Sequence, residues 1–266
     1  MRETPHLQRA QILLDQRRFD LAEAELRQLL AQQPEHPRAL ALLSLCRLNQ
    51  NDIPGAFRFS EQAIAQEPDW GFPYYLRALA LVQSNRVDDA IRTMDRVIEL
   101  DPTDADYRSF LAELHCVCNR PEQGIESARL GLSFKPEHVG CLNLIARERT
   151  RTGHFNEADS LLRTSLEIDP LRAETHSLQG ELKLQQGDIA AAQQSFDLAL
   201  TRAPGQTEAQ EGFLETRRAS NRLYRRLLPL LLRGERLTAE QPFASRLILL
   251  TLIIVLCVTA TKLSTG

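Results

Sequence analysis

Large apolar residues and small residues return at intervals of 34 positions along the first 206 residues of the chain. The large aliphatic column reads Leu30, Ile64, Ile98, Leu132, Leu166 and Leu200. Two small columns read Ala10, Ser44, Ala78, Ala112, Ala146 and Gly180, and then Ala22, Ala56, Ala90, Gly124, Ala158 and Ala192. The period predicts six structural repeats, with boundaries at 3–36, 37–70, 71–104, 105–138, 139–172 and 173–206.

Each repeat is expected to hold two antiparallel helices, near 5–17 and 20–33 in the first repeat and 34 residues further along in each later one. The small residues let helix backbones approach closely, and the aliphatic column fills the space between repeats. A proline follows the second helix of each repeat and ends it, because proline has no amide hydrogen and cannot continue a helix. These prolines are Pro34, Pro68, Pro102, Pro136, Pro170 and Pro204.

The repeats resemble the tetratricopeptide repeat (TPR) family. The segments "GFPYYLRALALVQSNRVDDAIRTMDRVIELDP" (71–102) and "AETHSLQGELKLQQGDIAAAQQSFDLALTRAP" (173–204) follow its pattern well. The resemblance covers about 3–206 and implies a right-handed superhelix with a concave groove, which in this family is mostly a protein-binding surface. Pro121 and Gly131 depart from the pattern, so we expect the fourth repeat to be looser than its neighbours.

The resemblance also implies that the first helix of each pair lines the groove. The groove positions of the second and third repeats are apolar, and an exposed apolar strip usually marks a binding site. An amphipathic helix or an extended apolar peptide would suit it. The expected contact residues are Leu42, Leu45, Phe72, Tyr75, Leu76, Leu79 and Phe110, with Arg147 as a further candidate for a peptide carboxylate.

Two alternatives to a peptide-binding groove stay open at this point. A tighter superhelix would bury these apolar residues internally, and a second copy of the chain would cover them in a homo-oligomer. For Arg147, which shares a groove column with Glu113 and Glu181, the competing interpretation is a ladder of ion pairs between repeats.

The repeats are followed by a predicted capping helix at 207–220, in which Phe213 and Leu214 cover the apolar edge of the last repeat. The next segment, 221–242, mixes leucines with arginines. It is typical of an interfacial helix that reaches anionic lipid headgroups, although a flexible basic linker is the alternative.

Residues 243–263 are expected to form a transmembrane helix. The run is long enough to cross a bilayer if Arg246 and Lys262 extend toward the headgroups. A buried core helix is the competing interpretation, but the capped repeats leave no core for it to join. Arginines gather on the N-terminal side, which places the repeats in the cytoplasm, as in a single-pass tail-anchored protein. The expected fold is therefore all-α: six TPR repeats, a capping helix and one C-terminal membrane anchor.

Charge is unevenly distributed along the chain. Of the net charge of −3, about +6 lies in 217–246 and +1 at Lys262, which leaves −10 on residues 1–216. An acidic body is a poor partner for nucleic acid. Membrane lipid is the expected partner of the basic segment, and a protein or peptide that of the repeats.

The sequence offers no catalytic motif. It has no Walker-type glycine loop, no GxSxG and no HExxH, and the repeats occupy most of the chain, so we expect neither an enzyme nor a cofactor. His115, Cys116, Cys118, His138 and Cys141 do not have the spacing of a zinc site, and buried free thiols explain the cysteines. The predicted function is a membrane-anchored scaffold that binds partners in its groove. The alternative is a structural subunit of a membrane complex with a permanently occupied groove.

Overall fold

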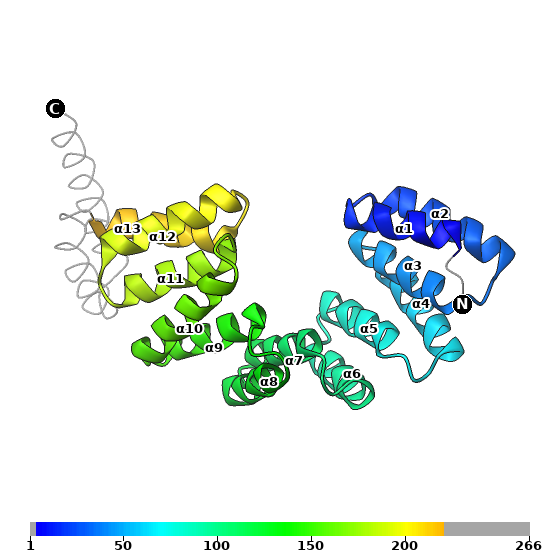
Figure 1. The fold of residues 1–266 in the computed structure, drawn as a ribbon, viewed down its shortest axis with the longest axis horizontal. Coiled ribbons are helices and arrows are strands. Elements are labelled where there is room, and N and C mark those ends of the chain that lie inside the picture. The colour runs from blue at the N-terminus through cyan, green and yellow to red at the C-terminus, as the bar shows by residue number, and fades with distance from the viewer. Residues whose placement is uncertain (1–3, 221–266) are drawn as a thin grey trace, which may run out of the picture. The chain divides into compact units, whose positions relative to one another are not determined.

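The computed structural model describes residues 4–220, and in this part of the chain it contains thirteen α-helices and no strand (Figure 1). The helices are α1 (Pro5–Asp15), α2 (Phe19–Gln32), α3 (Pro37–Asn49), α4 (Ile53–Gln66), α5 (Gly71–Gln83), α6 (Val87–Leu100), α7 (Ala105–Val117), α8 (Pro121–Phe134), α9 (Val139–Arg151), α10 (Phe155–Ile168), α11 (Ala173–Gln185), α12 (Ile189–Arg202) and α13 (Thr207–Ser220). The predicted helical solenoid is confirmed for this part of the chain.

The helices divide into two compact units. The first ends at Asp169 and holds α1 to α10, while the second begins at Pro170 and holds α11 to α13. Within the first unit each helix packs against the next, and α3 also contacts α5 while α7 contacts α9. First helices of neighbouring pairs therefore lie side by side at α3 with α5 and at α7 with α9, where they can share a face.

The second helix of each repeat ends where the prolines predict, at intervals of 34 residues. Each of the six prolines lies two residues after the last residue of a second helix. The turn inside each pair holds one residue with positive φ, a conformation that Asn and Gly adopt with little strain. These residues are Arg17, Asn51, Asn85, Asn119, Gly153 and Gly187.

The two small columns are buried throughout, as predicted. Their polar member, Ser44, donates a hydrogen bond from Oγ to the carbonyl of Ala56 at 2.8 Å, so that α3 and α4 touch without an unsatisfied hydroxyl. Close helix approach is thus the physical reason for the repeated small residues.

The two departures in the fourth repeat are accommodated by packing. Pro121 is the first residue of α8, where its missing amide hydrogen breaks no helical hydrogen bond. Gly131 leaves room for a neighbouring thiol, since a Cβ at this position would lie 2.8 Å from Cys141 Sγ. At these two residues the packing of the fourth repeat is therefore not loosened as we expected.

The predicted capping helix corresponds to α13, and one of its two predicted core residues packs against the last repeat. Phe213 packs against the buried cluster of Ala192, Phe196, Ala199 and Ala209. Leu214 is 51% exposed, so the prediction that it covers the last repeat is wrong. Adjacent residues point about 100° apart on a helix, and only one of the two can face the core.

The predicted basic segment at 221–242 and the predicted membrane helix at 243–263 lie outside the described residues. Among the helices of residues 4–220, none combines the length and the apolar character needed to cross a bilayer.

Candidate functional site

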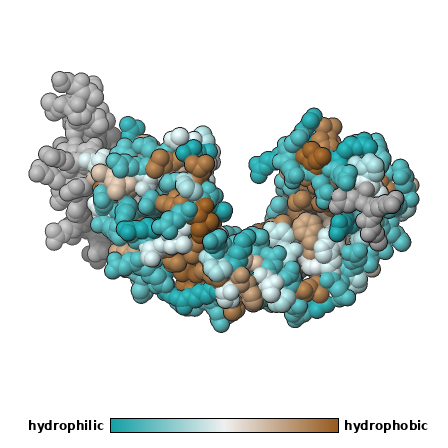
Figure 2. Space-filling view, in the orientation of Figure 1, coloured by the Kyte–Doolittle hydropathy of each residue, from teal (hydrophilic) through white to brown (hydrophobic). Residues whose placement is uncertain are grey.

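Predicted contact residues of the second, third and fourth repeats lie on α3, α5 and α7, the first helices of these repeats. Leu45, Phe72, Tyr75 and Leu79 all pack against the same buried cluster, which α3, α4 and α5 build. Each of the four remains partly exposed. Figure 2 shows brown apolar surface between teal polar surface where α3 and α5 lie in Figure 1. We call the partly exposed residues Leu42, Leu45, Phe72, Tyr75, Leu79 and Phe110 the apolar face.

A row of aromatic rings runs from the start of α5 to α7 and includes Phe72, Tyr75 and Phe110 of this face. The Trp70 and Phe72 ring centroids are 5.6 Å apart, and Phe72 and Tyr75 are 6.4 Å apart. Tyr75 then meets Tyr107 at 5.3 Å and Phe110 at 5.2 Å, the latter edge-on. These separations are typical of favourable ring pairs. Tyr75 is thus the residue that joins the aromatic surface of α5 to that of α7.

One predicted contact residue lies elsewhere. Leu76 is 0% exposed and belongs to the buried cluster beneath the face, so it is available to no partner in this structure. Sequence reasoning also missed two aromatic residues, Trp70 and Tyr107. Tyr107 lies three residues before Phe110, and this spacing on a helix was the available signal.

Burial and the charges of nearby carboxylates raise the pKa of both tyrosine hydroxyls. Burial raises the pKa of Tyr75, and the charges of Asp106, Glu113 and Asp104 raise it further. Burial, followed by the charges of Asp104 and Asp101, raises the pKa of Tyr107 to about 12. A carboxylate disfavours a second negative charge nearby, so both hydroxyls stay protonated at neutral pH.

Two of these carboxylates are positioned by hydrogen bonds. Asp104 caps α7 by accepting from the amides of Asp106 and Tyr107 at 2.8 and 3.1 Å. Asp106 Oδ1 lies 2.9 Å from Nε2 of His138, whose Nδ1 accepts from the amide of Cys141 at 3.1 Å. Because Nδ1 is the acceptor, the ring proton lies on Nε2 and is donated to Asp106. The acidic edge of the face is therefore ordered by α7 and α9.

Arg147, the remaining predicted contact residue, lies on α9 and has a partner in its own helix. Its Nε is 3.6 Å from Oε1 of Glu148, a carboxylate whose side chain is 3% exposed. Arg151 Nη1 lies 2.9 Å from Oε2 of the same residue. Arg147 thus compensates a buried negative charge, and its predicted role toward a peptide carboxylate stays a prediction.

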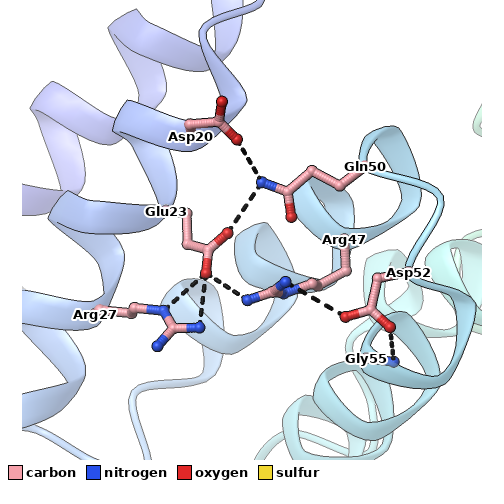
Figure 3. A network of polar contacts seen from close by, with 7 residues as sticks. All are labelled: Asp20, Glu23, Arg27, Arg47, Gln50, Asp52 and Gly55. Carbon is pink, nitrogen blue, oxygen red and sulfur yellow. Dashed lines mark hydrogen bonds and ion pairs between the residues drawn. The ribbon is translucent and has the colours of Figure 1, made fainter.

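A polar network fixes α3 against α2 (Figure 3). Glu23 Oε1 accepts from Arg47 and from Nε of Arg27, the latter at 2.8 Å. Glu23 Oε2 accepts from Nε2 of Gln50 at 3.0 Å, and this amide also donates to Asp20 at 2.8 Å. These contacts join the two helices through several side chains, which holds the C-terminal end of α3 in register with α2.

Arg47 of this network also contacts a residue at the start of the next helix, α4. Arg47 Nη1 lies 3.4 Å from Oδ2 of Asp52, which caps α4 by accepting from the Gly55 amide at 3.0 Å. The network therefore spans α2, α3 and α4.

The thiols are packing residues in this structure. Burial raises the pKa of Cys46 to about 12 and that of Cys141 to about 11, which keeps both protonated and poorly nucleophilic. Within residues 4–220, no three His, Cys, Asp or Glu side chains are grouped closely enough to hold a metal ion.

The comparisons with known proteins agree with this architecture. Two tetratricopeptide repeat models match the chain, one at residues 7–69 and 143–207 and the other at residues 47–114. The comparison with curated proteins found no match.

Three solved structures illustrate the similarity of fold. PilW, a type IV pilus biogenesis factor, aligns with a TM-score of 0.66 and 16% identity over 77% of this chain and 96% of its own. YrrB, described as a TPR protein with an unusual peptide-binding site, aligns with a TM-score of 0.50 and 14% identity over 70% of this chain and 96% of its own. Yeast Tom70 aligns with a TM-score of 0.61 and 18% identity over 78% of this chain and 46% of its own.

These matches and the thirteen described helices agree on an all-α helical repeat fold. The two family models together cover more than half of the sequence. The chain belongs to the tetratricopeptide repeat family.

Proposed function

We propose that the protein binds a segment of a partner protein on the apolar face of α3, α5 and α7. The observation that carries this proposal is the aromatic row, whose rings remain partly exposed although they pack against one another. Tyrosine and phenylalanine offer a large contact area at a small cost in side-chain entropy, and they are enriched at interfaces. A TPR structure described as having a peptide-binding site supports this class of partner by analogy of fold.

The rigidity of the surroundings supports the same proposal. The polar network of Figure 3 holds α3, and the His138–Asp106 hydrogen bond joins α9 to α7. A face carried on helices that are already held in place loses little entropy on binding, which favours recognition of a flexible segment.

We further propose that residues 243–263 hold the repeats at a membrane, with the repeats on the cytoplasmic side. This part of the proposal rests on the sequence alone: a long apolar run preceded by an excess of arginine. Tethering would confine the encounter with a partner to the membrane and raise the effective concentration there.

The binding proposal is tested with the variant Leu45→Glu/Leu79→Glu of the full chain. Two charges placed on the apolar face should abolish capture of the partner in an affinity pull-down from the native cell, because the partner would have to bury them. The matched control is Leu21→Glu/Leu130→Glu, which places the same charges at apolar residues of α2 and α8, helices that carry no residue of the face; both residues are 44% exposed. Circular dichroism and thermal unfolding check that both variants fold. Equal capture by the two variants would contradict the proposal.

The same experiment separates a receptor from a structural subunit. A receptor variant should remain stable and lose a transient partner, whereas a subunit variant should lose a stoichiometric complex or be degraded. Membrane anchoring is tested by deleting 243–266, which should move the protein to the soluble fraction. A truncated chain that stays with membranes after a high-salt wash would contradict a single anchor.

A further inference from the structure

The aromatic end of the apolar face lies in an acidic environment. The charged groups that raise the pKa of Tyr75 are the carboxylates of Asp106, Glu113 and Asp104. The face therefore combines two surfaces of different chemistry: aliphatic residues on α3 and α5, and aromatic rings beside carboxylates on α5 and α7.

The arginines of α5 and α7 interact with groups elsewhere. Arg77 Nη2 lies 3.9 Å from Oε1 of Glu61 on α4. Arg108 donates from Nε to the carbonyl of Pro102 at 2.9 Å, and its guanidinium lies 5.4 Å from the ring centroid of Phe134 on α8. Arg77 is thus engaged with α4, the second helix of the preceding pair, and Arg108 with α8 and with the turn before α7.

A ligand cation would find two favourable interactions at this end of the face. The face of an aromatic ring attracts a cation through its quadrupole, and the attraction grows when the cation is partly removed from water. The Tyr75 ring centroid lies 5.3 Å from that of Tyr107 and 5.2 Å from that of Phe110, and the side chain of Asp106 is 81% exposed. A carboxylate that is exposed and ordered by His138 can pair with an incoming cation without a rearrangement of the protein.

We infer that the segment bound by the apolar face is a basic amphipathic peptide. Its apolar side chains would cover Leu45, Phe72 and Leu79. Its lysine or arginine side chains would lie over the tyrosine rings, beside Asp106 and Glu113. This inference rests on the proposed function and adds the chemistry of the partner: charge complementarity selects a basic segment and rejects an acidic one.

The probes are three synthetic peptides of equal length, about 18 residues, with the same amphipathic leucine pattern. The first carries arginine at its polar positions, the second glutamine and the third glutamate. Binding of each labelled peptide to the full chain is measured by fluorescence anisotropy at low salt and at physiological salt. We expect the arginine peptide to bind at least about tenfold more tightly than the glutamine peptide, and the glutamate peptide to bind most weakly.

The variant Asp106→Asn/Glu113→Gln removes two charges and changes almost no volume. The side-chain amide introduced by Asp106→Asn keeps an oxygen that can accept from His138. We expect the affinity of this variant for the arginine peptide to fall by about five- to tenfold and its affinity for the glutamine peptide to be unchanged. The control is Glu122→Gln/Glu126→Gln, which removes two charges of α8. This control should stay within about twofold of the unaltered protein.

The outcomes separate the inference from the proposed function. Equal affinity for the three peptides, or no binding of the arginine peptide, would overturn the inference. An equal loss in the α8 control would also overturn it, because the attraction would then come from the net charge and not from the face. If Leu45→Glu/Leu79→Glu abolishes binding of the glutamine peptide while Asp106→Asn/Glu113→Gln changes nothing, the proposed function stands and the inference fails.

Discussion

The ring of Phe196 in α12 packs directly against Gly212 in α13. A Cβ atom built on Gly212 would lie 2.3 Å from Cζ of this ring, and one built on Gly180 of α11 would lie 2.8 Å from its Cδ1. Phe196 is fully buried and is the largest such side chain of the second unit. Three helices therefore meet at one ring, and two glycines make the room for it.

Replacement of Gly212 by alanine is expected to destabilise the second unit. Alanine has the higher helix propensity by about 1 kcal/mol, but the new methyl group would overlap the buried ring, and overpacking costs typically about 1–3 kcal/mol. The contact is with a ring that is fully buried, so the steric cost should prevail. We expect a net loss of about 1–2 kcal/mol, measured by urea unfolding.

Two further variants check the mechanism of this loss. Gly205→Ala adds the same methyl group where no atom lies within 4 Å, and it should change the stability by less than about 0.5 kcal/mol. Phe196→Leu should lessen the effect of Gly212→Ala in a double-mutant cycle. Additive losses would show that the ring is not the source of the cost.

The period of 34 predicted the helices well because the packing demands are local and repeated. A helix pair can close only where small residues face each other, and Ala22, Ala56 and Ala90 meet this demand at the same place in each repeat. The chain breaks at Pro34 and its equivalents have an equally local cause. A repeated local constraint is visible in the sequence, whatever the neighbours are.

The candidate site was harder to predict because exposure depends on neighbours from other repeats. Leu42, Leu76 and Phe110 occupy the same column, yet only Leu76 is fully buried. The column gives the direction of a side chain on its helix, but the side chains that cover it come from adjacent helices. For the same reason the hydrogen bond between His138 and Asp106, which are 32 residues apart, had no signal in the sequence.

Loss of the Glu23 charge is expected to weaken the junction of α2 with α3. The side chains of Glu23 and Arg47 are only 14% and 19% exposed, and hydrogen bonds to charged groups contribute about 1.5–3 kcal/mol each when they are shielded. Glu23→Gln should therefore lower the free energy of unfolding by about 1.5–3 kcal/mol.

The exposed partner of the same carboxylate provides the comparison. Arg27 is 60% exposed, so Arg27→Ala should cost less than about 1 kcal/mol. Both values are obtained from denaturant unfolding in the same buffer. Losses of equal size would mean that burial of the Glu23–Arg47 pair has no energetic consequence.

Stability is expected to fall at alkaline pH. The folded protein keeps Cys46 and Tyr107 protonated up to a pKa of about 12, and Cys141 up to a pKa of about 11. In the unfolded chain thiols ionise near about pH 8.5 and tyrosines near about pH 10. The unfolded state then binds fewer protons, so this contribution to stability is complete below about pH 8.5 and is lost as the pH rises toward the folded values.

Urea unfolding at a series of pH values from about 7 to 10 measures this dependence. Each thiol contributes a slope of at most about 1.4 kcal/mol per pH unit once the unfolded chain has lost the proton. Cys46→Ala removes one such group, so its stability should decline less steeply above about pH 9, even if the variant is less stable at neutral pH. Parallel pH profiles for the variant and the unaltered protein would contradict the assignment.

Arg17 is expected to be a strained residue whose replacement stabilises the protein. It adopts φ of 58° at the turn position that Asn51, Asn85, Asn119, Gly153 and Gly187 fill in the other repeats. The left-handed conformation costs an ordinary L-residue about 1–2 kcal/mol, whereas asparagine tolerates it through local hydrogen bonds of its side chain. Arg17→Asn should therefore raise the free energy of unfolding by about 0.5–1 kcal/mol.

Arg17→Ala distinguishes the effect of backbone strain on stability from the effect of the side-chain charge. Alanine removes the guanidinium and keeps the strain, so it should bring no gain. The reciprocal variant Asn51→Ala places an ordinary residue in the same turn of the second repeat, at φ of 60°, and should lose about what Arg17→Asn gains. Thermal unfolding of the three variants tests the whole set. If Arg17→Ala stabilises as much as Arg17→Asn, the gain comes from removing a charge, and the turn conformation is not the cause.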